Sequence, residues 1–155
     1  MTLFSRMDSP VGPLTLTWNG ALTGVGFDTE PVGTRDDRAL AVARRQLDEY
    51  FRGKRECFEL PLALAGTPFQ LAVWAALVKI PFGRAVSYRD IARSIGRPRA
   101  VRAVGAANGQ NPLAIVVPCH RVIGADGSLT GYGGGVPKKR WLLEHEGALL
   151  RLGTA

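Results

Sequence analysis

The stretch VSYRDIARSIGRPRAVRAVGAANG, residues 86–109, predicts two short helices around a tight glycine turn. Ser87 can cap the first helix, and Gly96 then breaks it. Pro98 opens a second helix that runs to about Asn108. Two such helices form the helix-turn-helix pattern, although many all-helical cores contain the same arrangement. The stretch therefore predicts a helical lobe and a possible reader of nucleic acid.

The second of these helices has an unusual composition. Val101 and Val104 are expected to face the core, while Arg99 and Arg102, three residues apart, share another face. Most of the remaining side chains are as small as that of Ala103, where an ordinary solvated helix would carry Glu and Lys. Small side chains allow a close approach to another backbone. The composition suits a helix pressed into a nucleic-acid groove, with one long cationic side chain reaching inward.

Positive charge is concentrated in the second part of the chain. The net charge is +7, yet residues 1–65 hold 8 Lys/Arg against 9 Asp/Glu, and residues 66–155 hold 12 against 4. Six arginines lie within residues 84–102, where Asp90 is the one acidic residue. Such a block either faces a polyanion or keeps the protein soluble, and charge alone leaves both readings open.

Residues before the junction predict a small lobe of strands followed by a helix. The apolar patterns that predict strands fall at 2–8, 13–20 and 22–28, and a further strand is expected at 57–62. Asn19-Gly20 predicts a hairpin between two of them. Residues 34–51 read as a helix capped by Thr34. Cys57 is interpreted as a small buried hydrophobic residue.

The segment from Ala65 to Pro68 looks like the junction between two lobes. Thr67 can cap a new helix with Pro68 at its first position. We therefore expect an α+β protein with a small N-terminal sheet-and-helix lobe, residues 1–65, in a structural role. It would pack on a mostly helical, winged-helix-like C-terminal lobe, residues 66–155, that contains the helix-turn-helix.

Several classes of protein are disfavoured by composition. The apolar runs are too short for a membrane span, and the N-terminal residues do not resemble a signal peptide. The 2 cysteines cannot form a disulfide framework, and with the 2 histidines they give no four-ligand zinc spacing. We expect reduced thiols and a cytoplasmic protein.

A second stretch, IVVPCHRVIG at residues 115–124, places Cys119 directly beside His120 at the end of what reads as a buried strand. A nearby imidazole lowers the pKa of a thiol and so favours the nucleophilic thiolate. Neighbouring side chains of an extended segment point to opposite faces, so the two can cooperate only if Pro118 forces a turn or a water bridges them. The dipeptide alone favours a buried cysteine beside a surface histidine.

The flanking residues strengthen the catalytic reading. The Asn111 amide can tie two backbone segments together, and the glycine-rich segment 124–135 is suited to a pocket wall or lid. A final helix, about 136–145, brings Glu146 to its end. That carboxylate could orient a histidine and raise its basicity, although nothing in the sequence shows that it reaches His120.

At this point the sequence resembles a known family. The stretches SYRDIA, RAVGAANGQNPLAIVVPCHRVIG, LTGYGGG and LLEHEG resemble the O6-alkylguanine-DNA alkyltransferases, also called methylated-DNA–protein-cysteine methyltransferases. The resemblance is dense from Gly66 to Gly147 and looser in the N-terminal lobe. A related group that binds alkylated DNA without repairing it replaces the cysteine, which this chain keeps. The cysteine-rich zinc lobe of the long regulatory members is missing.

The resemblance implies a role for each residue around the thiol. Cys119 would accept the alkyl group, and His120 would act as its base through a water. Glu146 would orient His120, and Asn111 would brace the turn that carries the cysteine. Tyr88 would crowd the phosphate beside the target and offer its hydroxyl to the guanine ring.

The resemblance also implies how DNA and the damaged base are held. Arg102 would enter the duplex through the minor groove and fill the space of the extruded base. The other expected DNA contacts are Arg99, Ala103 and Arg121. The expected pocket residues, whose backbone or side chains surround guanine, are Val122, Tyr132, Gly133 and Gly134. Gly133 has no hydroxyl where some members have serine, which leaves room for a larger alkyl group.

The implied reaction is a single, irreversible transfer from O6-alkylguanine in double-stranded DNA, without a cofactor or metal. The product thioether has no carbonyl that water could attack. We expect a monomer in solution, and leave open cooperative binding along DNA and the repair of O4-alkylthymine. Two alternatives remain: a non-catalytic protein that senses alkylated DNA, and a cysteine hydrolase of small esters or amides.

Overall fold

The computed structural model describes residues 1–151, with side chains through Leu149. The chain divides into two compact units, which are described separately: residues 1–64 with 112–116, and residues 65–111 with 117 onward. The sequence boundary at 65/66 did not anticipate that a short later segment, Pro112–Val116, belongs with the first unit. Within the described residues no helix has both the length and the apolar character needed to cross a membrane.

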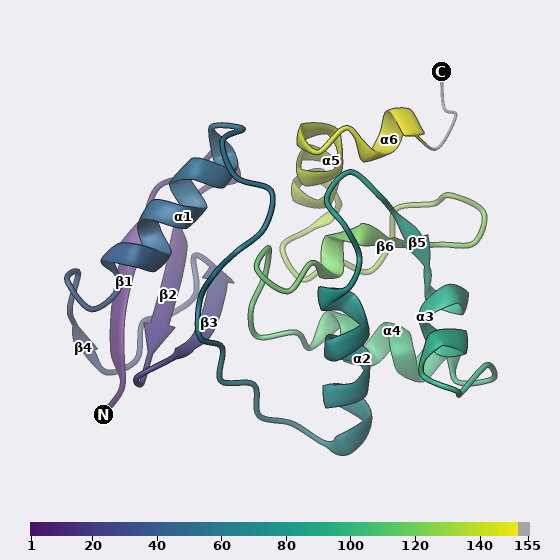
Figure 1. The fold of residues 1–155 in the computed structure, drawn as a ribbon, viewed down its shortest axis with the longest axis horizontal. Coiled ribbons are helices and arrows are strands. Elements are labelled where there is room, and N and C mark those ends of the chain that lie inside the picture. The colour runs from purple at the N-terminus through teal and green to yellow at the C-terminus, as the bar shows by residue number, and fades with distance from the viewer. Residues whose placement is uncertain (152–155) are drawn as a thin grey trace. The chain divides into compact units, whose positions relative to one another are not determined.

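The first unit is built on a four-stranded sheet (Figure 1). Its strands are β1 (Leu3–Met7), β2 (Leu14–Trp18), β3 (Leu22–Phe27) and β4 (Thr34–Arg35), in the order β3-β2-β1-β4. β2 and β3 pair antiparallel, which confirms the hairpin predicted from Asn19-Gly20. Gly20 takes a φ of 104°, which only glycine adopts readily.

One helix, α1 (Ala41–Phe51), covers a face of this sheet (Figure 1). The predicted start at Thr34 is wrong, because Thr34 lies in β4, where it pairs with Leu3 of β1. The N-cap position of the helix is Leu40, whose side chain makes no capping hydrogen bond. Gly33, at a φ of 90°, turns the chain so that Thr34 donates its N–H to the Thr2 carbonyl at 3.1 Å. Pairing with the sheet edge therefore overrides the local helix propensity of 34–40.

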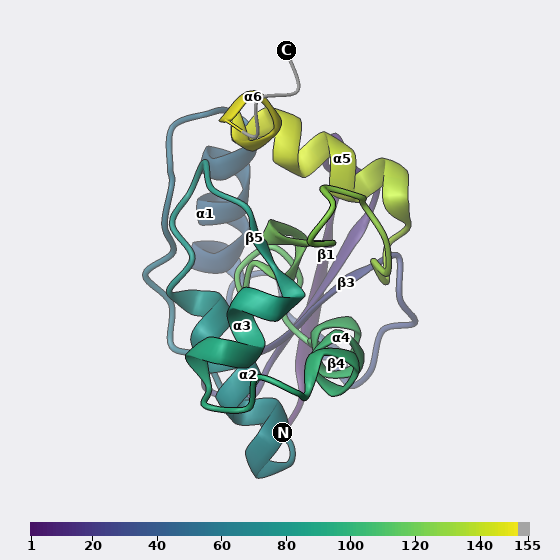
Figure 2. The ribbon, with the colours of Figure 1, turned by 90° about the vertical axis from the view of Figure 1, so that its right-hand side faces the viewer.

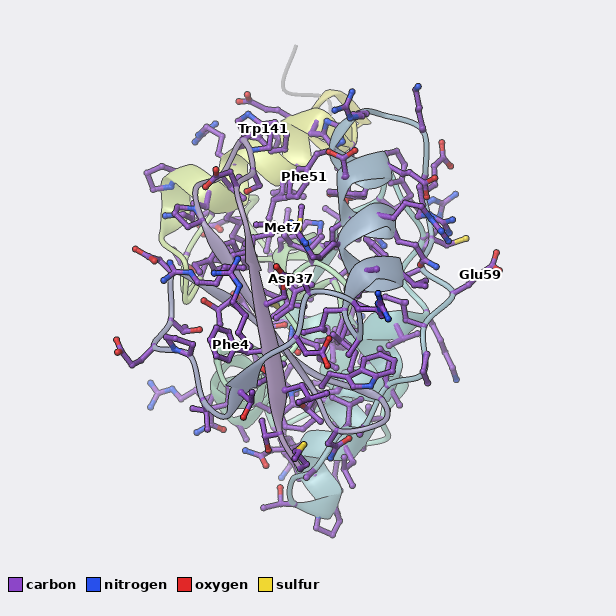
Figure 3. All side chains as sticks on the ribbon, turned by 90° about the vertical axis from the view of Figure 1, so that its left-hand side faces the viewer. Phe4, Met7, Asp37, Phe51, Glu59 and Trp141 are labelled. Carbon is purple, nitrogen blue, oxygen red and sulfur yellow. The ribbon has the colours of Figure 1, made fainter. Side chains whose placement is uncertain are left out.

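The segment predicted as a strand at 57–62 is a loop with one bridge, between Leu22 and Leu62. It is held to α1 by the buried Gln46, whose amide accepts from Glu59 N–H at 2.9 Å and donates to its carbonyl at 3.1 Å. The Glu59 side chain points outward (Figure 3). Cys57 is exposed, so its interpretation as a buried hydrophobic residue was wrong. The loop offers it no neighbouring strand to pack against.

The second unit begins with α2 (Pro68–Val78), followed by α3 (Tyr88–Ser94) and α4 (Val101–Gly109). Thr67 and Ser87 cap the first two helices through complete capping boxes, as the sequence predicted. α3 and α4 lie side by side (Figure 2). They form the expected helix-turn-helix arrangement.

α4 starts three residues later than predicted, at Val101 instead of Pro98, because the preceding residues form a turn in which Ala100 donates to the Arg97 carbonyl at 2.9 Å. Val104 is buried, as predicted, whereas Val101 is 36% exposed and does not face the core. Arg99 therefore precedes the helix and does not share a helical face with Arg102.

The chain around the cysteine turns instead of extending. Ile115 has a φ of 72°, which is strained for a β-branched residue and ends any strand there. Cys119–Arg121 then form a 3₁₀ turn, η1, before the two-residue strand β6 (Val122–Ile123). β6 pairs parallel with β5 (Val86–Ser87). The strand expected before the cysteine is thus wrong, and the turn allowed by Pro118 is present.

Two helices follow in the last part of the chain, α5 (Val136–His145) and α6 (Ala148–Arg151). α5 has the predicted bounds, and Glu146 is its C-terminal cap residue. The sheet-and-helix unit and the mostly helical second unit confirm the α+β class predicted from the sequence.

Candidate active site

Residues 84–102, which include α3 and the start of α4, present a basic surface. Its six arginines, all exposed, are Arg84, Arg89, Arg93, Arg97, Arg99 and Arg102. None of the six forms an ion pair with another described residue. Arg102 and Ala103 both lie on the exposed side of α4, where Arg102 is the long side chain among small ones. The geometry suits contact with a polyanion, since no carboxylate of the described residues pairs with these cations.

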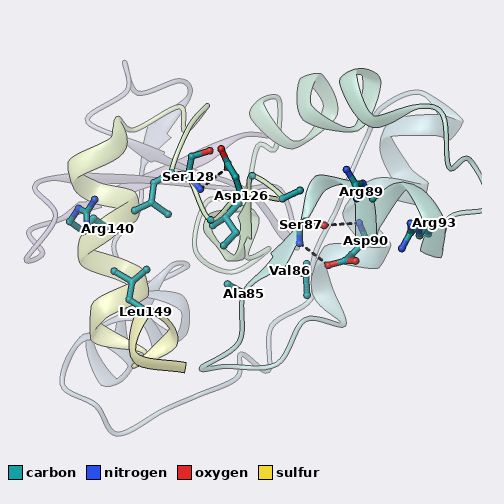
Figure 4. Close-up of a pocket in the computed structure, with 15 residues that line it drawn as sticks. Ala85, Val86, Ser87, Arg89, Asp90, Arg93, Asp126, Ser128, Arg140 and Leu149 are labelled. Carbon is teal, nitrogen blue, oxygen red and sulfur yellow. Dashed lines mark hydrogen bonds between the residues drawn. The ribbon is translucent and has the colours of Figure 1, made fainter. Parts of the chain in front are cut away.

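A surface groove lies between α3, the 123–129 segment and α5 (Figure 4). Its volume is about 810 Å³, and Arg89, Arg93 and Arg140 line it. Ser87 and Asp90 also line it, but each is occupied by the cap of α3, where their backbone and side-chain groups exchange hydrogen bonds. The groove extends the basic surface, and Cys119 is not among its lining residues.

Cys119 is held by hydrogen bonds to the backbone on both sides of it. It is 6% exposed, and its N–H donates to the Val117 carbonyl at 2.8 Å. The Asn111 amide donates to the same Val117 carbonyl at 2.8 Å. The Asn108 amide, on α4, donates to the Cys119 carbonyl at 3.3 Å. These bonds tie the backbone on both sides of Cys119 to Asn108 of α4 and to Asn111, the residue expected to brace this turn.

The charge state of the thiol is set by competing effects. Burial raises the pKa of Cys119 above its usual value, while the hydrogen bond from Asn111 and the positive charge of Lys139 act in the opposite direction. Because the net direction is upward, most of the sulfur is protonated at neutral pH. The thiol therefore requires a base before it can act as a nucleophile.

The structure brings Glu146 to His120, which the sequence could not show. The Nε2 atom of His120 lies 2.8 Å from Glu146 Oε2, and both side chains are buried. Burial lowers the pKa of His120, which leaves the imidazole neutral at pH 7. Burial alone would raise the pKa of Glu146, but hydrogen bonds and charge from His120 and Arg121 lower it to about 2. The carboxylate is therefore charged and accepts the Nε2 proton, which makes Nδ1 the acceptor.

Arg121, predicted to contact DNA, is instead a buried partner of Glu146. Its Nε and Nη2 atoms donate to the two Glu146 oxygens at 2.8 and 3.0 Å. Nη1 donates to the Ile80 carbonyl at 2.7 Å, and the guanidinium lies over the Phe82 ring. The prediction was wrong because the 3₁₀ turn directs this side chain inward. The Glu146 carboxylate is thus bound by the Arg121 guanidinium and by the His120 imidazole, which becomes a cation when it takes up a proton.

Tyr88 and Lys139 form a second polar cluster, which contains a residue that the sequence analysis missed. The Tyr88 hydroxyl donates to the Thr130 carbonyl at 3.0 Å. The buried Lys139 ammonium donates to that carbonyl at 2.9 Å and to the Tyr88 hydroxyl at 3.4 Å. Burial raises the pKa of Tyr88, and burial lowers the pKa of Lys139 to about 8.

A signal for Lys139 was present in the sequence. Lys139 precedes Leu142 and Leu143 by three and four residues, and both leucines are fully buried in α5. That spacing places the lysine on the buried stripe of the helix. A lysine there is unusual, and it marked a buried cation near the site.

The expected pocket residues lie close to these groups. Val122 is buried, and Tyr132 is half-buried, with its pKa raised well above its usual value by burial. A Cβ at Gly131 would lie 3.5 Å from the Tyr88 hydroxyl, and one at Gly133 would lie 3.9 Å from the Gly109 carbonyl. The 131–134 loop, which includes Gly134, thus passes beside α3 and the end of α4. Gly133 is exposed and has space for a small side chain.

Comparisons with known proteins cover both units. The family model for the DNA binding domain of 6-O-methylguanine DNA methyltransferase matches residues 68–148, and that for its ribonuclease-like domain matches residues 3–64. The methylated-DNA–protein-cysteine methyltransferase of Mycobacterium tuberculosis H37Rv is 52% identical over 153 residues, covering 94% of this chain and 93% of the relative. That of Methanosarcina barkeri is 46% identical over 156 residues, covering 96% and 99%.

Solved structures are similar over the same length. Mycobacterium tuberculosis O6-methylguanine methyltransferase superposes with a TM-score of 0.89 at 50% identity, covering 95% of this chain and 93% of that one. The Mycobacterium tuberculosis protein OGT, solved in complex with DNA, superposes with a TM-score of 0.90 at 51% identity, covering 94% and 92%.

Proposed function

The chain belongs to the 6-O-methylguanine DNA methyltransferase family, and we propose that it repairs DNA by moving the alkyl group of O6-alkylguanine onto Cys119. One observation carries the assignment of the residues. The buried thiol of Cys119 is followed by the neutral, buried His120, whose Nε2 atom lies 2.8 Å from the Glu146 carboxylate. This arrangement supplies a base to a thiol that needs one.

The proton step follows from the electrostatics of the site. The thiol proton leaves Cys119 through a water molecule and arrives at Nδ1 of His120. The imidazolium that forms is stabilised by the charged Glu146, whose second oxygen remains bound to Arg121. The sulfur then attacks the alkyl carbon, the S–C bond forms as the C–O6 bond breaks, and the electron pair stays on guanine.

The leaving guanine needs a proton or a hydrogen bond, and Tyr88 is suited to provide it. Its hydroxyl is anchored at the Thr130 carbonyl, and Lys139 lies at 3.4 Å from the hydroxyl oxygen. An ammonium at that distance stabilises the developing phenolate if the hydroxyl proton moves to the base. At that point His120 holds the thiol proton and Tyr88 has given its proton to guanine; His120 then releases one proton to solvent and Tyr88 takes one up, so the complete reaction has no net change in protons.

The damaged base must leave the DNA stack before Cys119 can reach it. Extrusion costs a few kcal/mol, less for a base whose pairing is weakened by alkylation. On this proposal the exposed Arg102 of α4 enters the minor groove and occupies the vacated space, while the other exposed arginines within residues 84–102 hold phosphates. The relative OGT of Mycobacterium tuberculosis was solved with DNA, which supports the same partner for this chain.

The thioether on Cys119 has no carbonyl for water to attack, so each molecule reacts once. On this proposal residues 66–155 read DNA and accept the alkyl group, and residues 1–65 are structural. Acceptance of larger alkyl groups, expected from the missing hydroxyl at Gly133, stays a prediction. Activity on O4-alkylthymine, the monomeric state and the cytoplasmic location expected from the sequence stay predictions.

The deciding experiment is the intact mass of the protein after incubation with a duplex containing O6-methylguanine. We expect the mass to rise by one methyl group, with the same duplex carrying unmodified guanine as the control. Peptide mapping should place the methyl on Cys119. An unchanged mass with retained binding would favour a non-catalytic sensor of alkylated DNA.

A further inference from the structure

Asn108 is a buried side chain of α4 to which neither the sequence nor the proposed mechanism gives a role. It is 1% exposed and lies on the helix that carries Arg102. Its Nδ2 atom donates to the carbonyl of Cys119 at 3.3 Å. That carbonyl belongs to the peptide group joining Cys119 to His120. The amide of Asn108 therefore lies against the bond between the nucleophile and its base.

The orientation of this amide is determined by its partner. The Cys119 carbonyl can only accept, so the nitrogen of Asn108 must face it, and the Oδ1 atom faces elsewhere. Oδ1 is buried and has no hydrogen-bond partner among the described residues. Leaving a buried carbonyl oxygen without a donor destabilises the folded protein. The position therefore calls for a donor.

His120, the residue that follows this carbonyl, also has a buried acceptor without a donor. Its Nε2 proton is taken by Glu146, so Nδ1 is an acceptor, and Nδ1 is also buried without a partner among the described residues. One buried acceptor thus belongs to His120, and the other to the side chain that binds the Cys119 carbonyl. A water molecule carries two O–H donors and can also accept the thiol proton, which satisfies both acceptors and the thiol together.

We propose that Asn108 is a positioning residue for alkyl transfer: its N–H fixes the Cys119–His120 peptide, and its Oδ1 shares with His120 Nδ1 the water that carries the thiol proton. The inference rests on the function proposed above. With two of its hydrogens directed at Oδ1 and Nδ1, the water presents its lone pair to the thiol. As the S–H proton arrives at the water, the water gives the hydrogen directed at Nδ1 to His120, and atoms and charge balance.

The test is the pH dependence of single-turnover transfer from an O6-methylguanine duplex by Asn108→Leu, which conserves volume and removes both polar atoms. The wild-type rate should be nearly flat above the pKa of His120, because the relay deprotonates the thiol. The variant should be slower at pH 7 by about tenfold or more, and its rate should rise with pH towards the wild-type rate as hydroxide produces the thiolate. Its affinity for the duplex should be unchanged.

A matched control is Gln46→Leu, which likewise replaces a buried amide by leucine, but in the first unit. The Gln46 amide makes two hydrogen bonds to the backbone of Glu59. Gln46→Leu should lower the melting temperature and leave the pH profile of transfer flat. If Asn108→Leu fails to fold, Asn108→Ala is expected to give the same rising profile.

Three outcomes separate the possibilities. A rising profile for the variant beside a flat wild-type profile supports the relay. A pH profile of the variant that is parallel to the wild-type profile overturns the role of Asn108, whatever the absolute rate of the variant. That outcome leaves the proposed function intact. No transfer by the wild-type protein overturns the proposed function, and the inference with it.

Discussion

The two units of this chain bury polar groups of different kinds. In the first unit the buried polar side chains are neutral: Ser5, Thr15 and Gln46. In the second unit most of them are ionisable: His120, Arg121, Lys139 and Glu146, with the neutral Asn108 among them. Neutral groups buried with their hydrogen bonds made are inexpensive, whereas buried charges require close partners. The buried polar groups of the first unit therefore need only hydrogen bonds, whereas the second unit retains buried charges that need partners of opposite charge.

The two cysteines give the sharpest form of this comparison. Cys119→Ser should abolish methyl transfer, because a hydroxyl beside the same base is a much weaker nucleophile, and should leave binding to the duplex unchanged. Cys57→Ser, in the exposed loop of the first unit, should transfer at the wild-type rate. Intact mass and a gel-shift titration measure the two properties. Loss of binding in Cys119→Ser would show that recognition and chemistry are not separate.

The second-largest expected effect comes from the ion pairs, because breaking a buried pair costs more stability than breaking a partly exposed one. Glu146→Gln leaves Arg121 buried without an anion and should destabilise the protein by about 3–5 kcal/mol. It should also slow transfer about a hundredfold, because the imidazolium loses its counter-charge. Glu49→Gln breaks the partly exposed pair with Arg55 in the first unit and should cost about 0–1 kcal/mol. Urea denaturation of both variants checks this; equal losses would remove the distinction between the units.

The Glu146 carboxylate also predicts how the free energy of unfolding depends on pH in acid. The pKa of Glu146 in the folded protein is about 2, below its usual value of 4.5. The folded state therefore binds this proton less readily than the unfolded state, so the stabilisation is complete above pH 4.5 and is lost as pH falls towards 2. We expect the stability difference between wild type and Glu146→Gln to shrink by on the order of 3 kcal/mol across that interval. A constant difference would contradict the charged state of Glu146.

The smallest expected effect concerns DNA. Arg102→Ala should slow repair of duplex DNA by at least about tenfold, because base extrusion costs a few kcal/mol and the arginine offsets part of it. Reaction with free O6-benzylguanine, which needs no extrusion, should change little. Arg45→Ala, an exposed arginine of α1 in the first unit, is the matched control and should alter neither rate. Equal slowing with both substrates would argue against a role in extrusion.

The sequence was informative where local chemistry decides the structure. Thr67 and Ser87 capped their helices as predicted, since each cap needs only a hydroxyl and a carboxylate or amide three residues later. Asn19-Gly20 gave its hairpin for the same local reason. The helix expected to begin at Thr34 failed, because pairing with β1 is a long-range contact that no local pattern contains.

At the site, the sequence determined which chemistry was available: one cysteine beside one histidine, a glycine-rich loop and a basic pair of helices. Only the tertiary structure decided the direction of each side chain. The 3₁₀ turn at Cys119–Arg121 sends Arg121 inward to Glu146, 25 residues away, and α5 turns Lys139 to Tyr88, 51 residues away. Such pairs depend on burial and on the packing of distant elements, and these set both the pKa values and the partners of buried charges.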